Sequence, residues 1–217
     1  MDANNYSTTP NKTDMETLQS TPEALEKYAR ICYDYCEKAQ KILQEKDDSG
    51  PITGWAREVI VYAKHLGQFE HMLGAAYVVT RDMAECLFDH PRLLLELKET
   101  ELEILEYIEA VEHHDLEITD DLRAEINTLR HNIQAADEGR WEAIITNSHL
   151  NHDPVEWTKE YEEVIDEADH EAYSHLTDVP RGMGFCFAYW AEKSKALARR
   201  GIDWRSPSRM NPGVLFD

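Results

Sequence analysis

The chain has 217 residues, of which 42% are hydrophobic and 30% are charged, and its 43 acidic and 22 basic side chains give a formal net charge of −21. This composition is typical of a globular protein and disfavours broad contact with nucleic acid or an anionic membrane surface. A chain of this length forms one large domain or two small ones, and it buries roughly 70% of its unfolded surface without needing disulfides.

Membrane insertion and secretion are both disfavoured by the residue pattern. No run of about 18 apolar residues occurs, so no membrane span is expected. The Met1 end is polar and lacks the apolar stretch of a signal peptide. The four cysteines form no paired CxxC units and lie among apolar neighbours, which indicates reduced core thiols and a cytoplasmic protein. They are Cys32, Cys36, Cys86 and Cys186.

The N-terminal part divides into an arm and a helix. Residues 1–19 are rich in Asn and Thr and aperiodic, so we expect a flexible N-terminal arm. Ser20 is a candidate helix cap, Pro22 suits a first helical turn, and Glu23 completes a capping box. Apolar positions then recur at spacings of three and four, which predicts a helix with one buried stripe. They are Leu25, Tyr28, Cys32, Tyr35, Ala39 and Ile42.

A second helical region is predicted from about residue 53 to residue 88. It contains Gly67 and Gly74, which are seven residues apart and would share one face of a continuous helix. Glycine inside a helix costs up to about 1 kcal/mol relative to alanine. The pair therefore favours a close helix crossing, with a break near Gly74 as the alternative.

Four more helices complete the prediction, over about 91–113, 119–136, 154–176 and 184–200. Thr119 and the capping box Asp153–Glu156 mark two of the starts, and Gly201 suits a left-handed C-terminal cap. No segment alternates like a strand. The sequence thus predicts an all-α, irregular bundle of five to seven helices over residues 20–201, with an extended C-terminal tail over 202–217.

The C-terminal segment differs in charge from the remainder. Residues 180–217 contain seven basic and three acidic side chains, a net charge of +4, whereas the other residues sum to −25. Pro207 and Pro212 argue against helix near the end, and a disordered tail is seldom so rich in large apolar residues. We therefore expect a docking tail that binds the protein's own body, another subunit or, through Trp204, Arg205 and Arg209, a phosphate group or RNA. The predicted docking residues are Trp190, Trp204, Arg205, Arg209, Met210, Leu215 and Phe216.

The helix predicted over 154–176 carries the best candidate metal ligands, Glu167, His170, Glu171 and His175. Glu-x-x-His is the unit that bundle-type di-iron sites use. Those sites need a second such unit on a facing helix, and none occurs here. A solvated polar face is the simpler interpretation, because acidic helices produce such spacings by chance.

His114 and Asp115 form a His-Asp pair of the kind found in a class of helical metal-dependent phosphohydrolases. That chemistry needs an earlier histidine, for which His65 and His71 are available, and a later aspartate, for which Asp166 and Asp169 are available. The alternative is a helix end at which histidines are favourable.

Two further patterns have simpler structural interpretations. Glutamates repeat from Glu96 to Glu112 as in helical nucleotide pyrophosphohydrolases, but they cover several helix faces instead of converging on one metal. Cys32 and Cys36 are one turn apart, and their apolar surroundings favour core packing over metal binding.

These observations lead to three functional hypotheses. The first is a non-enzymatic assembly protein, homo-oligomeric and anchored by its tail to a neighbouring subunit; one form of it is a viral portal or connector-type ring component, which would place the chain in a virion. The second is a metal-dependent helical phosphohydrolase or another enzyme with a carboxylate and histidine site. The third is an acidic regulatory or inhibitory protein that binds a basic partner. The expected partner is the chain itself or another protein subunit, with no cofactor and no sequence-specific nucleic-acid binding.

Overall fold

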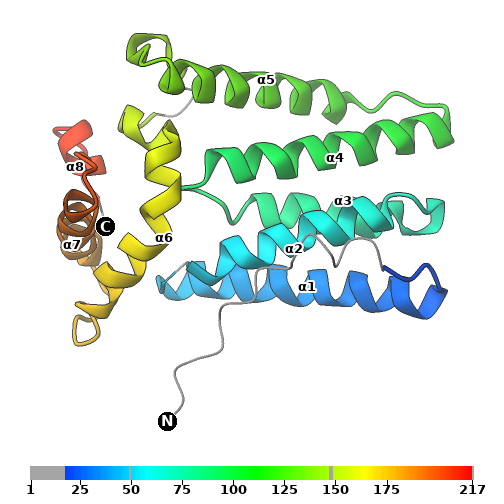
Figure 1. Ribbon diagram of the computed structural model, residues 1–217, viewed down its shortest axis with the longest axis horizontal. Coiled ribbons are helices and arrows are strands. Elements are labelled where there is room, and N and C mark those ends of the chain that lie inside the picture. The colour runs from blue at the N-terminus through cyan, green and yellow to red at the C-terminus, as the bar shows by residue number, and fades with distance from the viewer. Residues whose placement is uncertain (1–17, 49, 147–148, 217) are drawn as a thin grey trace. The chain divides into compact units, whose positions relative to one another are not determined.

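The computed structural model describes residues 18–48, 50–146 and 149–216, and within these ranges it contains eight α-helices and no strand (Figure 1). The predicted all-α class is therefore confirmed. Residues 1–17 of the predicted arm and Asp217 of the predicted tail lie outside the described residues. The helices are α1 (Pro22–Glu45), α2 (Gly50–Leu66), α3 (Leu73–Ala84), α4 (Pro91–Glu112), α5 (Glu117–Asp137), α6 (Lys159–Ser174), α7 (Phe185–Arg199) and α8 (Pro207–Met210).

The chain forms two compact units. The first comprises Met1–Lys41, Pro51–Leu87 and Leu93–Ala124, and the second comprises Ile42–Gly50, Phe88–Arg92 and Glu125–Asp217. The second unit thus contains α6, α7, α8 and the connections that adjoin them.

In the first unit, α1 buries one stripe of side chains as its spacing predicts, including Leu25, Cys32 and Ala39. The Cys36 thiol donates to the carbonyl oxygen of Val79 at 3.5 Å, which links α1 to α3. Burial raises the pKa of the Cys36 thiol to about 12, so this cysteine is a neutral core residue. The start of α1 differs in one detail, because the hydroxyl of Thr21, not that of Ser20, accepts from the backbone of the first turn.

The second predicted helix is interrupted after Leu66. A short 3₁₀ turn (Glu70–Met72) separates α2 from α3, so Gly67 and Gly74 do not lie on one continuous helix. A Cβ at Gly67 would lie 3.2 Å from Cγ1 of Ile104 in α4, whereas a Cβ at Gly74 would have no neighbour within 4 Å. The close approach predicted for the glycine pair therefore exists at Gly67 alone. This break, together with the short α8, takes the helix number beyond the predicted range.

We expect Gly67→Ala to lower the free energy of unfolding by about 1 kcal/mol, because the added methyl group presses on Ile104 and on the carbonyl oxygen of Ala63, also 3.2 Å away. Gly74→Ala is the matched control and should be neutral or stabilising by up to about 1 kcal/mol, since alanine is the better helix former. Urea denaturation followed by circular dichroism measures both. Equal effects would show that Gly67 does not serve the contact with α4.

Helix α5 begins at Glu117, two residues before the predicted cap. The Glu109 carboxylate accounts for this start, since it accepts from the Thr119 hydroxyl at 2.6 Å and from the backbone N–H of Leu116 at 2.7 Å. These hydrogen bonds lower the pKa of Glu109. At the other end, Gly139 follows the helix with a positive φ of 68°.

The predicted capping box Asp153–Glu156 forms a 3₁₀ turn (Pro154–Trp157) in place of the first turn of α6. Thr158 then caps α6, because its hydroxyl accepts from the backbone N–H of Tyr161 at 3.2 Å. After α7 the chain turns at Gly201, whose φ of 84° is the left-handed conformation that the sequence predicts there.

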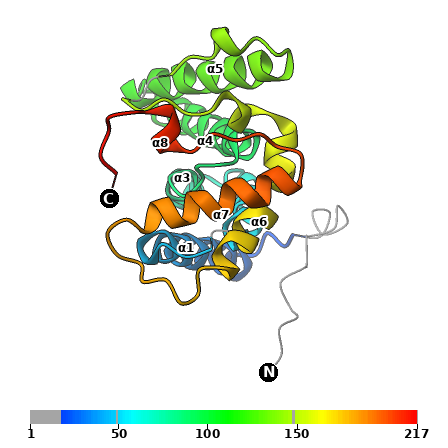
Figure 2. The same ribbon diagram turned by 90° about the vertical axis from the view of Figure 1, so that its left-hand side faces the viewer.

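The segment after Gly201 is not extended throughout. Pro207 begins the four-residue helix α8, so the expectation that the prolines exclude helix here is wrong. A proline at the first helical position has no N–H to leave unsatisfied, and its fixed φ suits the helix. Figure 2 shows α8 beside α7, with α6 behind α7.

Among the residues that the structure describes, none of the helices combines the length and the apolar character that crossing a membrane requires.

Candidate functional site

The two sides of α7 have different surroundings. One side packs on α6 and carries Phe185, Tyr189, Lys193, Ala196 and Leu197, of which all but the half-buried Tyr189 are buried. The other side borders a groove next to α8. The residues of each side recur at helical spacing, so α7 is one helix with two functions: packing and surface formation.

The packing side contains an ionic cluster that we define as Asp89, Tyr161, Asp169, Tyr189 and Lys193. Lys193 Nζ lies 2.9 Å from Asp89 Oδ2 and 3.5 Å from Asp169 Oδ1. The hydroxyl of Tyr161 donates to Asp89 at 3.0 Å, and that of Tyr189 donates to Asp169 at 2.7 Å. Three separate segments therefore meet at one ammonium group: residues 88–92, α6 and α7.

Apolar groups surround this ionic cluster. Tyr161, Ile165, Ala168, Leu197 and Trp204 form a buried core with Ala196. The Lys193 ammonium also lies 5.4 Å from the centroid of the Trp204 ring and 5.8 Å from that of the Tyr161 ring. An ammonium over aromatic faces in such a site retains part of the attraction that it loses on leaving water.

Charge balance sets the pKa of each ionisable group in the cluster. Burial alone would lower the pKa of Lys193, but the carboxylates of Asp169 and Asp89 raise it well above its ordinary value. Burial raises the pKa of Asp169 to about 6, and repulsion from Asp89 adds to this, against the attraction of Lys193. For Asp89 burial acts upward too, yet Lys193 and the Tyr161 hydroxyl outweigh it and the net pKa is lowered. The ion pair is thus Lys193 with Asp89, and Asp169 is the carboxyl group that binds a proton most readily.

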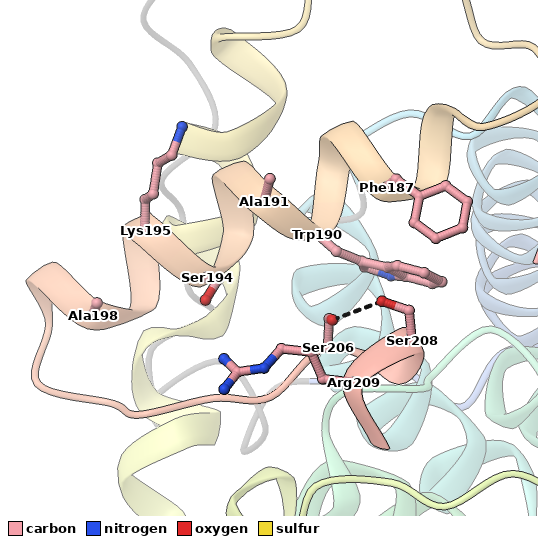
Figure 3. A pocket seen from close by; sticks show the side chains of 9 residues that line it. All are labelled: Phe187, Trp190, Ala191, Ser194, Lys195, Ala198, Ser206, Ser208 and Arg209. Atoms are coloured by element: carbon pink, nitrogen blue, oxygen red, sulfur yellow. Dashed lines mark hydrogen bonds between the residues drawn. The ribbon is translucent and has the colours of Figure 1, made fainter. Parts of the chain in front are cut away.

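The groove on the other side of α7 has a volume of about 430 Å³ (Figure 3). The rings of Phe187 and Trp190 stand at one end of it with their centroids 5.5 Å apart, perpendicular to each other. The guanidinium of Arg209 extends along the opposite part, below Ser194. The lining residues are Phe187, Trp190, Ala191, Ser194, Lys195, Ala198, Ser206, Ser208 and Arg209.

The charge of this groove comes from Arg209. Lys195 contributes its stem, but its ammonium points away in Figure 3 and donates to Glu192 at 2.5 Å. Arg209 is exposed and forms no ion pair within the described part of the chain. The other basic side chains after residue 180 are paired within their own unit, for example Arg205 with Asp153 at 3.1 Å and Arg200 with Glu171 at 2.6 Å.

The predicted docking residues are divided between burial and exposure. Trp204 is 3% exposed and its indole N–H donates to Glu156 at 2.6 Å, while Phe216 packs edge-on against Trp190 at 5.1 Å. Leu215, in contrast, is 97% exposed, and Met210 is intermediate. Part of the tail therefore completes the second unit, and part remains available for a partner.

The candidate metal ligands on α6 have separate partners. His170 Nδ1 lies 2.6 Å from Asp48 and His175 Nδ1 lies 3.2 Å from Glu192. Both Arg199 and Arg200 bind Glu171, and Arg200 also lies 3.7 Å from Glu167. These arginines lower the pKa of Glu171 and occupy the oxygens that a metal would need.

His114 and Asp115 lie in the exposed turn between α4 and α5. They belong to the first unit, whereas Asp166 and Asp169 belong to α6 in the second. Among the described residues, no group of three or more His, Cys, Asp or Glu side chains is placed to hold a metal ion.

The ionic cluster was not predicted from the sequence. Lys193 is one of the seven basic residues counted over 180–217, but it falls four residues after Tyr189 and four before Leu197, on the buried side of α7. That spacing is the signal that would have identified it. Asp89 has no comparable signal, because it lies 104 residues from Lys193 in a connection between helices.

No protein-family model, no curated protein and no solved structure matches this chain.

Proposed function

We propose that this chain is a non-enzymatic assembly protein that binds a second copy of itself through the groove between α7 and α8. One observation carries the proposal: the groove is lined by the exposed ring of Phe187 and by the guanidinium of Arg209, which forms no ion pair with any described residue. Phe187, which lines the groove, is 48% exposed, and Leu215, which precedes the Phe216 ring that packs on Trp190, is almost fully exposed. Such a patch on a globular protein is a typical site of protein–protein contact.

Charge complementarity favours a second copy as the occupant. The chain carries a net charge of −21, so a second copy has an excess of carboxylates that could pair with Arg209. A groove that binds a different surface of the next copy makes a head-to-tail contact, which closes into a ring or extends as a filament. A ring component of the portal or connector type is one assembly that such a contact builds.

The test is the mass in solution, measured by light scattering at micromolar concentrations. We expect the full chain to scatter as a multiple of 25.1 kDa, and Phe187→Glu or Leu215→Glu to shift it toward a single chain, because the first places a carboxylate in the groove lining and the second places one next to Phe216, whose ring packs on Trp190. Point substitutions are needed because truncation before Trp204 would remove part of the core.

Phe88→Glu is the matched control, since Phe88 is 75% exposed but does not line the groove. It should leave the mass unchanged. A full chain that is already monomeric, or one that Phe88→Glu dissociates as effectively as Phe187→Glu, would overturn the proposal. Circular dichroism of each variant shows that a lower mass does not come from unfolding.

A further inference from the structure

The ionic cluster holds one more carboxyl group than it has cations to neutralise. Lys193 lies closer to Asp89 than to Asp169, and Asp89 also receives the Tyr161 hydroxyl. Asp169 keeps a hydrogen bond from Tyr189 and a longer contact with Lys193, although only 2% of its surface is exposed. An ionised carboxylate at such a depth is costly unless it is fully paired.

The charged and titratable groups that face Asp169 come from α7, from the segment before α4 and from α6. Lys193 and Tyr189 face it from α7, Asp89 faces it from the segment before α4, and Tyr161 and Tyr173 lie on α6 itself. Burial raises the pKa of all three tyrosines, so they remain neutral. Lys193 is therefore the one positive charge among these groups, and it serves two carboxyl groups.

We propose that the protonation state of Asp169 determines how stably α7 packs on α6. With Asp169 protonated, the cluster contains one ammonium and one carboxylate and is neutral. When the proton leaves to solvent, a second carboxylate faces the same ammonium and the buried cluster carries a net negative charge. The side chain of Asp89 is 30% exposed, so the cluster borders solvent that can exchange the proton.

Protonation of Asp169 is also expected to affect the groove, because α7 contributes residues to the ionic cluster and to the groove. Lys193 and Tyr189 lie on the side of α7 held by the cluster, and Phe187, Trp190 and Ser194 lie on the side that lines the groove. A change in how α7 sits on α6 therefore reaches the groove through one rigid helix. The proposed role of Asp169 does not depend on the proposed function, and its test measures only melting temperatures and the titration of the Asp169 carboxyl group.

The direction of the pH dependence follows from the raised pKa of Asp169, about 6. The unfolded chain releases this proton at the ordinary, lower aspartate pKa, so the folded state binds more protons between these two values. The stability contribution is fully present below the ordinary aspartate pKa and is lost as the pH rises from that value through about 6. Asp169→Asn imitates the protonated state at every pH, because its amide oxygen can still accept from Tyr189.

The experiment compares melting temperatures from pH 4.5 to 7.5 for the wild-type chain, Asp169→Asn and the control Glu163→Gln, which removes an exposed carboxylate from the same helix. We expect the difference by which Asp169→Asn melts above wild type to grow by roughly 2–4 °C between pH 4.5 and pH 7, because the wild type loses the contribution of its Asp169 proton over this range. Glu163→Gln should follow the wild type throughout. Subtracting the curves removes the general effect of the high net charge.

A titration of Asp169 in the wild-type chain tests the proposal even if the Asp169→Asn variant fails to fold. The carboxyl ¹³C resonance of Asp169 in the wild-type chain, assigned through its own backbone, should titrate near pH 6, while exposed aspartates titrate about two pH units lower. An Asp169 resonance that titrates with the exposed aspartates overturns the proposal. So does a folded Asp169→Asn whose pH profile is parallel to that of the wild type.

Discussion

Replacing Lys193 by methionine should lower the free energy of unfolding by about 3–5 kcal/mol, the usual cost of removing one partner from a buried ion pair. The substitution keeps most of the apolar stem but leaves Asp89 and Asp169 without their shared cation. The ammonium also contacts the Tyr161, Tyr189 and Trp204 rings, so it cannot be replaced by solvent without opening the core. Urea denaturation followed by circular dichroism measures the change.

Lys195→Met is the matched control on the same helix. Its side chain is 59% exposed and pairs with Glu192 at the surface, so its loss should change stability by no more than about 0.5 kcal/mol. The comparison also tests the reason for the large effect. Adding Asp89→Asn and Asp169→Asn to Lys193→Met removes the unpaired charges and should recover part of the loss. Similar costs for Lys193→Met and Lys195→Met would contradict the assignment of Lys193 as the buried counterion.

Trp204→Ala should be the second most costly substitution, lowering the free energy of unfolding by about 3–5 kcal/mol. The ring packs in the core that Tyr161 and Leu197 share, and its N–H binds Glu156, so truncation opens a cavity and frees a carboxylate. Trp204→Phe retains most of the volume and should cost less. The same denaturation experiment measures both variants.

Trp141→Ala is the control, because Trp141 is 43% exposed, far more than Trp204, and its loss should change stability less. The result also separates two roles for the C-terminal segment. If Trp204 bound a neighbouring subunit and not its own core, Trp204→Ala would lower the mass in solution and leave the unfolding of the single chain unchanged. That outcome would contradict the packing described above.

The second helical region shows that local spacing alone does not place the end of a helix. The apolar positions from Val59 to Met83 are compatible with one long helix, and Gly67, the residue after Leu66, is compatible both with a helix end and with a close helix crossing. Gly67 lies against Ile104 in α4, and the periodicity of the sequence around Gly67 does not show that this distant residue is its neighbour. Thr158 illustrates the same point, since it caps α6 although Asp153 offers the stronger capping pattern.

The sequence by itself determined the properties that depend on neighbours a few residues apart. Spacings of three and four determined the all-α class, and Gly201 marked the end of α7, because helices form from local hydrogen bonds and local caps. Only the tertiary structure decided which charges meet. Lys193, Asp89 and Asp169 come from three segments, and it is their common burial, not their spacing, that makes them a cluster. The same holds for the C-terminal residues: contacts with α6 and α7 bury Trp204 and leave Leu215 and Arg209 exposed, and no local pattern distinguishes these fates.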